Sequence, residues 1–168
     1  PRDQALVQAL TFGASEPFDS IVGPMSVHNG MVGIVVHEGR VVAEWGDTSR
    51  VDMTHSVTKT FLSTLVGLAW RDGLIRDIHD EARAYMPLGV DLFEAEHNQT
   101  ITWDDLLRQT SDWQGSLWGK PDWADRPEGD RADWLDRQLF APGTRYKYND
   151  VRVNMMAYSL LHLPLIHI

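Results

Sequence analysis

The sequence predicts an α+β domain in which a β-hairpin within residues 30–46 precedes a helical region over residues 55–163. Two observations lead to this prediction. Short β-rich runs flank a turn near the start, and a long apolar segment without proline, residues 60–70, follows them. Strands that come first and helices that come later are typical of an α+β fold.

The hairpin is predicted from two runs, residues 31–37 and 40–45, which are rich in valine and other β-formers. The turn between them is Glu38-Gly39, and a two-residue turn ending in glycine is typical of a tight hairpin. Two strands alone are marginally stable in water, so a sheet that contains this hairpin needs more strands to be independently stable.

The apolar segment 60–70 is hydrophobic on nearly every side, which is typical of a helix buried in the middle of a domain. Thr54 or Asp52 could cap its start, and Gly73 suits the left-handed position after its end.

Ser56 and Lys59 lie three residues apart near the first turn of this helix, so their side chains share one face. A lysine that loses water there is expected to favour its neutral form and to accept a proton. A serine hydroxyl becomes a good nucleophile only when such a base takes its proton. The helix N-terminus also directs amide groups, including the N–H of Ser56, toward developing negative charge. Residues 56–59 also fit the start of an ordinary buried helix, in which the Lys59 side chain extends to solvent.

Other segments show helical signals of apolar spacing, capping residues or acidic first turns. Thr102 is the expected cap of one of them. The segments are 4–12, 101–109, 133–140 and 151–163.

Residues 111–134 are unusually rich in tryptophan, and aspartate and arginine alternate with the indoles. The aromatic residues could pin a long surface loop to the body of the domain. Alternatively, the segment is a lid over a cleft, in which case Trp113 and Trp118 are candidate substrate-binding residues.

The composition excludes several classes of protein. The formal net charge is −9, which makes nucleic acid or an anionic membrane surface an unexpected partner. No apolar run reaches transmembrane length, and the first residues do not form a signal peptide. The chain has no cysteine, no zinc-type histidine spacing and no glycine-rich phosphate loop, so we expect neither a metal nor a cofactor. The compartment stays open between cytoplasmic and, with an N-terminal segment removed, periplasmic or secreted.

Four segments occur in an order that resembles the β-lactamase-related serine hydrolases. The similarity covers roughly residues 30–163 and is to the class C β-lactamase, esterase and D-aminopeptidase side of the superfamily, especially relatives of 6-aminohexanoate-dimer hydrolase. It implies a β-lactamase/transpeptidase-like fold. The segments are Ser56-Val57-Thr58-Lys59, Gly73-Leu74-Ile75, residues 101–107 with Thr110-Ser111, and Pro142-Gly143-Thr144 with Tyr148-Asn149-Asp150.

The resemblance implies a role for each matching residue. Ser56 matches the nucleophile that forms the acyl-enzyme, and Lys59 matches the lysine that shares its proton. Tyr148 matches the tyrosine of a Tyr-x-Asn motif, which relays a proton to the leaving group. A tyrosine can act as a base only where a cation such as Lys59 stabilises its phenolate. Tyr146 is a rival that lacks an Asn-like residue two positions on.

The sequence departs from the family pattern in two places. Asp150 stands where the family usually has asparagine, and a carboxylate there is expected to raise the proton affinity of Lys59 and to alter recognition of a substrate amide. The family's third motif, Lys-Thr-Gly or His-x-Gly on a later strand, has no match after residue 150. We therefore expect residues 1–168 to form a partial domain, the N-terminal portion of the fold, without the later strands.

The expected function is a serine hydrolase that cleaves an ester or amide in a small molecule through an acyl-enzyme on Ser56. The alternatives are a penicillin-binding D,D-peptidase or β-lactamase, and a non-catalytic fragment or binding relative that lacks the third motif. The sequence does not choose the acyl substrate or the oligomeric state.

Overall fold

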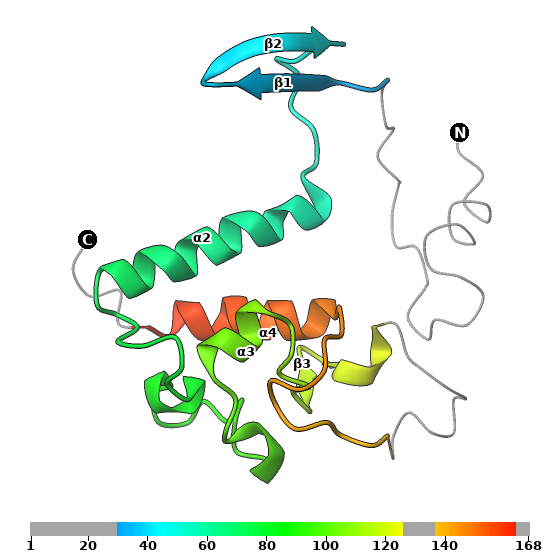
Figure 1. The fold of residues 1–168 in the computed structure, drawn as a ribbon. Helices are drawn as coiled ribbons and strands as arrows, with labels where there is room; N and C mark the ends of the chain where they lie inside the picture. Colours follow the sequence, from blue (N-terminus) through cyan, green and yellow to red (C-terminus); the bar gives the residue numbers. More distant parts are fainter. Residues whose placement is uncertain (1–29, 126–136, 164–168) are drawn as a thin grey trace. The chain divides into compact units, whose positions relative to one another are not determined.

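The computed structural model describes residues 30–125 and 137–163 (Figure 1). These residues belong to two compact units, one that ends at His55 and one that begins its main part at Ser56. The first unit contains the hairpin, and the second contains the helices. The predicted helix at 4–12 lies outside the described residues, as does the first half of the helix predicted at 133–140. The second half of that prediction, residues 137–140, is wrong, because these residues are not helical.

The predicted hairpin is confirmed. Strands β1 (Gly33–His37) and β2 (Arg40–Trp45) pair antiparallel, with a bulge after Val35. Both turn residues, Glu38 and Gly39, have positive φ angles, of 49° and 75°, which match the right-handed twist of the strands. The apolar side chains on both faces of the hairpin are largely exposed.

Helix α2 (Thr58–Arg71) is the long helix that the apolar segment predicts, and it follows a single 3₁₀ turn, η1 (His55–Val57). The expected caps Thr54 and Asp52 are wrong, because the 3₁₀ turn makes Val57 the N-cap residue, and α2 has no side-chain capping hydrogen bond. Gly73 has a φ angle of +76°, as predicted for the residue that ends the helix.

The prediction that this helix is buried all round is wrong. Only Val66 and Ala69 are buried in α2, while Phe61, Leu65 and Trp70 are exposed. The described residues of the second unit supply a packing surface along one side of the helix only, and a helix buries only the face that meets a partner.

Helix α3 (Trp103–Leu107) and helix α4 (Asp150–Leu161) confirm the two later helix predictions. The cap predicted for α3 is present as a capping box between Thr102 and Asp105. The remaining elements are short: η2 (Ala82–Tyr85), η3 (Glu96–Asn98), β3 (Ser116–Leu117), β4 (Lys120–Pro121) and η4 (Asp122–Ala124).

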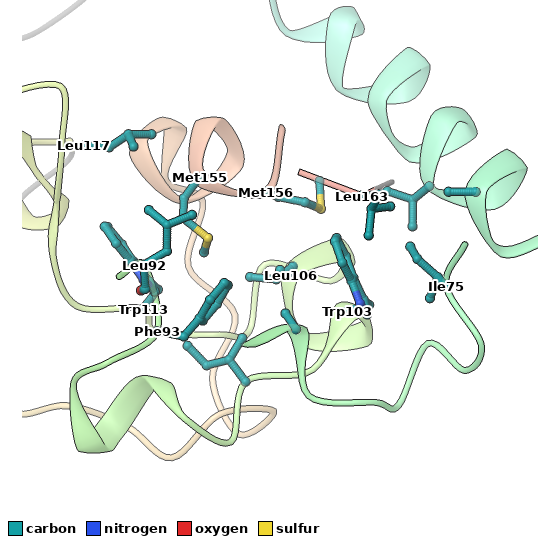
Figure 2. Close-up of a cluster of buried hydrophobic side chains, with 14 of the residues drawn as sticks. Ile75, Leu92, Phe93, Trp103, Leu106, Trp113, Leu117, Met155, Met156 and Leu163 are labelled. Atoms are coloured by element: carbon teal, nitrogen blue, oxygen red, sulfur yellow. The ribbon is translucent and has the colours of Figure 1, made fainter. Parts of the chain in front are cut away.

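The core of the second unit lies where α2, α3 and α4 meet the loops between them (Figures 1 and 2). Met155 and Met156 of α4 face Trp103 and Leu106 of α3 in Figure 2. This packing fixes α4 against the rest of the unit, and the start of α4 carries the polar residues described below. No helix in residues 30–125 and 137–163 is long and apolar enough to cross a membrane.

Candidate active site

Ser56, Lys59 and Tyr148 meet at one point in the second unit. The Ser56 Oγ lies 2.6 Å from the Tyr148 Oη, and the Lys59 Nζ donates a hydrogen bond to the Ser56 Oγ at 3.2 Å. The Lys59 Nζ also lies 4.7 Å from the centre of the Tyr148 ring. Ser56 and Lys59 therefore both contact Tyr148, although 92 positions separate the serine from the tyrosine.

The local backbone explains how the nucleophile candidate is presented. Ser56 is exposed in the η1 turn, directly before α2, and Lys59 lies in the first turn of that helix. His55, immediately before the serine, has a φ angle of +45° in the left-handed region. Such a conformation is costly for a residue other than glycine, and such strain clusters at functional sites.

Asn149 holds the segment that carries Tyr148. Its buried side chain caps α4 by accepting a hydrogen bond from the Arg152 N–H at 3.0 Å, and it donates one to the Asp122 carbonyl at 2.7 Å. Its own backbone N–H donates to the Gln109 side chain. Because these contacts come from three different parts of the chain, they fix the backbone on both sides of this residue.

Asp150 forms an ion pair with Lys59, with 2.7 Å between Oδ1 and Nζ. Partial burial, the largest single influence, lowers the pKa of Lys59. Hydrogen bonds to Asp150 and Tyr148, together with their charges, outweigh burial, so the pKa is raised above the ordinary value of 10.5. The expectation of a neutral Lys59 is therefore wrong, and the lysine is an ammonium group at neutral pH. The other expectation, that Asp150 raises the proton affinity of Lys59, is in line with this direction of the pKa.

This ion pair gives a testable consequence for the reactivity of Lys59. In Asp150→Asn the pKa of Lys59 should fall, since the carboxylate no longer favours the ammonium form. More of the amine is then neutral at any pH below the pKa, so reductive methylation of Lys59 should be faster at pH 8–9 than in the unchanged chain. Peptide mass spectrometry measures the rate. Lys120 serves as the internal control, and an equal rate at Lys59 in the two proteins would contradict the assignment.

Three buried residues, Arg152, Asp112 and Asp122, form a charged cluster with the partly buried Arg137. The Arg152 Nη2 is 2.6 Å from an Asp112 oxygen, and Arg137 contacts both Asp112 at 2.9 Å and Asp122 at 2.7 Å. Arg152 is only 4% exposed, and burial lowers its pKa. Since Arg152 belongs to the first turn of α4, the cluster ties the start of that helix to the loop that begins near residue 112.

The two tryptophans predicted to bind substrate lie in different environments. The prediction for Trp113 is wrong, because the side chain is 2% exposed in the core and its Nε1–H donates to the Leu92 carbonyl at 2.6 Å. Trp118 is 73% exposed and packs edge-on against Tyr158 of α4. A substrate-binding role for Trp118 and for Asp150 stays a prediction. Trp134 lies outside the described residues.

A comparison with protein families places these observations in context. The family model described as Beta-lactamase matches residues 18–161, which is most of the chain. The chain belongs to the β-lactamase family. The match also supports the predicted α+β fold of the β-lactamase-related serine hydrolases. A search of curated proteins and a search of solved structures gave no match.

In this β-lactamase-family chain, sequence reasoning missed the residues that hold the site together. Asn149 has a visible signal, since an asparagine directly before an apolar helix is a typical N-cap. Asp112 and Arg152 have no such signal in the sequence, because a charged residue does not indicate which distant charged residue it will contact. Within residues 30–125 and 137–163, no three histidine, aspartate or glutamate side chains gather as ligands for a metal ion.

Proposed function

We propose that this protein is a serine hydrolase that cleaves an ester or amide bond through an acyl-enzyme on Ser56. The observation that carries the proposal is the position of the Ser56 Oγ between the Lys59 Nζ, at 3.2 Å, and the Tyr148 Oη, at 2.6 Å. A nucleophile in hydrogen-bond contact with its proton acceptor, which is oriented by a third group, is the arrangement that covalent catalysis requires.

The hydrogen bonds of Ser56 to Lys59 and Tyr148 indicate which group can accept the serine hydroxyl proton. An ammonium group only donates, so the bond from Lys59 uses a lone pair of the Ser56 oxygen. The serine hydroxyl proton is then free to point at the Tyr148 oxygen. The Tyr148 oxygen is therefore placed to take that proton, and the Lys59 ammonium lies beside its ring.

The reaction proceeds in two balanced halves. The Ser56 oxygen bonds to the substrate carbonyl carbon while its proton passes to Tyr148, and the tetrahedral intermediate collapses with loss of the alcohol or amine, which takes that proton. Water then attacks the acyl-enzyme, gives a proton to Tyr148 and releases the acid, and Ser56 regains a proton. The Ser56 N–H stabilises the oxyanion in both halves.

An active-site probe tests the assignment. A fluorophosphonate should add to Ser56 in the gene product that contains these 168 residues, with a phosphorus–oxygen bond formed and fluoride released. Peptide mass spectrometry should find a single adduct, on the peptide that contains Ser56. The adduct should be absent in Ser56→Ala and present in Ser63→Ala, which removes an exposed serine from α2.

Three results would point elsewhere. Labelling at another serine would mean that Ser56 is not the nucleophile. Labelling at Ser56 without turnover of any ester or amide would favour the non-catalytic relative. A stable penicilloyl adduct on Ser56 would favour the penicillin-binding alternative.

A further inference from the structure

Gln109 forms hydrogen bonds with the residues on both sides of Tyr148. Its backbone carbonyl accepts a hydrogen bond from the Lys147 N–H at 3.0 Å, and its side-chain Oε1 accepts one from the Asn149 N–H at 3.2 Å. Residues 143–146, which lead to the tyrosine, are exposed, so burial contributes little to their position. Gln109 therefore holds the backbone of Tyr148 from both sides.

The backbone of Gln109 has a conformation that glycine adopts more easily. Gln109 directly follows Arg108, the C-cap residue of α3, and its φ angle is +55°. Its N–H donates a hydrogen bond to the Leu106 carbonyl, and the next N–H, that of Thr110, donates one to the Asp105 carbonyl. These two hydrogen bonds form a Schellman motif, in which the residue at this position is usually glycine. A glutamine there is strained.

The strain indicates that the side chain has a role of its own, since strained residues cluster at functional sites. The hydrogen bond from the Asn149 N–H to Oε1 is a contact that glycine could not make. We propose that Gln109 is a positioning residue that holds the Tyr148 oxygen within hydrogen-bond distance of the Ser56 hydroxyl, at 2.6 Å. This inference rests on the proposed function of Ser56. Gln109 acts through the backbone and takes no part in the proton transfer itself.

Three substitutions separate the side-chain acceptor from the strain. Gln109→Gly removes the acceptor and the strain, and Gln109→Met removes only the acceptor. Gln109→Glu keeps an oxygen that can accept the hydrogen bond from the Asn149 N–H. All three keep the backbone carbonyl that accepts from Lys147, so only one of the two hydrogen bonds beside Tyr148 is varied.

The readout is the rate at which a fluorophosphonate labels Ser56 in the gene product, measured over a range of probe concentrations. In Gln109→Gly and Gln109→Met, the limiting rate at saturating probe should fall about tenfold or more, because a misplacement of about 1 Å can cost about 100-fold. The probe concentration that gives half the limiting rate should stay unchanged, since the misplaced group acts in the chemical step. Gln109→Glu should react faster than Gln109→Met.

A stability measurement separates positioning from folding. Gln109→Gly should leave the midpoint of urea unfolding nearly unchanged, because relief of the strain offsets the lost hydrogen bond. A limiting rate that falls only in step with this midpoint would assign Gln109 a structural role and would overturn the inference. The control is Glu38→Gly, which makes the same kind of change at another positive φ angle, of 49°, and should leave the labelling of Ser56 unchanged.

Failure of the inference can be distinguished from failure of the proposed function. Labelling of Ser56 at an unchanged rate in Gln109→Met, or an equal loss in Gln109→Met and Gln109→Glu, overturns the role of Gln109 and leaves the serine hydrolase in place. No labelling of Ser56 in the unchanged protein overturns both.

Discussion

Replacing Ser56 with alanine should abolish hydrolysis of a short-chain p-nitrophenyl ester by the gene product that contains this sequence. Without the hydroxyl, no acyl-enzyme can form. Replacing Lys59 with alanine should be nearly as severe, because the ammonium donates to the serine oxygen and lies beside the Tyr148 ring that takes part in the proton transfer. A proton-transfer group alone is worth about 10²–10⁴-fold, so each single variant should lose at least that much in kcat/KM.

The double variant is the sharper measurement. Residues that act as one unit give losses that do not add, so Ser56→Ala with Lys59→Ala should be scarcely worse than either change alone. Lys120→Ala, a change to a lysine outside the site, should keep the activity of the unchanged protein. Full activity in Ser56→Ala, or losses that multiply in the double variant, would contradict the proposed pair.

Replacing Arg152 with methionine should cost about 3–5 kcal/mol of folding free energy, because it leaves two buried carboxylates with a single arginine. The change also removes the hydrogen bond to the Trp113 carbonyl at 3.2 Å. Urea unfolding of the chain followed by tryptophan fluorescence measures the loss. Since the cluster holds the start of α4, labelling of Ser56 should slow as well.

A second substitution separates charge from packing. Adding Asp112→Asn to Arg152→Met removes one of the two carboxylates, restores charge balance within the cluster and should recover part of the stability. The control is Arg108→Met, which breaks an exposed ion pair with Asp104 and should cost less than about 1 kcal/mol. A loss of that small size in Arg152→Met would mean that Arg137 alone neutralises the two aspartates.

Local pattern in the sequence was enough to predict the hairpin, helices α2, α3 and α4, and half of the site. The turn at 38–39 indicated the hairpin, and the three-residue spacing of Ser56 and Lys59 at a predicted helix start indicated that their side chains meet. Tyr148 required the resemblance to a family, because nothing within the sequence links it to a serine so far away. That link exists only through the packing of α4 on the core.

The failed predictions have a common physical cause. The apolar composition of α2 says how hydrophobic the helix is but not which partners cover it, and here one side is covered. Trp113 was expected at a cleft, yet its indole N–H finds a partner at Leu92 inside the core. The expected neutral form of Lys59 followed from burial alone, and the neighbouring carboxylate of Asp150 reversed it.

The distance along the chain between Ser56 and Tyr148 has a consequence during synthesis. A ribosome adds about 5–20 residues per second, so the 92 positions between them take on the order of ten seconds to make. Throughout that interval the emerging chain holds a serine without its proton acceptor. Ser56 should therefore become reactive only when α4 packs on the core of the second unit. The time at which a fluorophosphonate begins to label nascent chains would then measure when this unit folds.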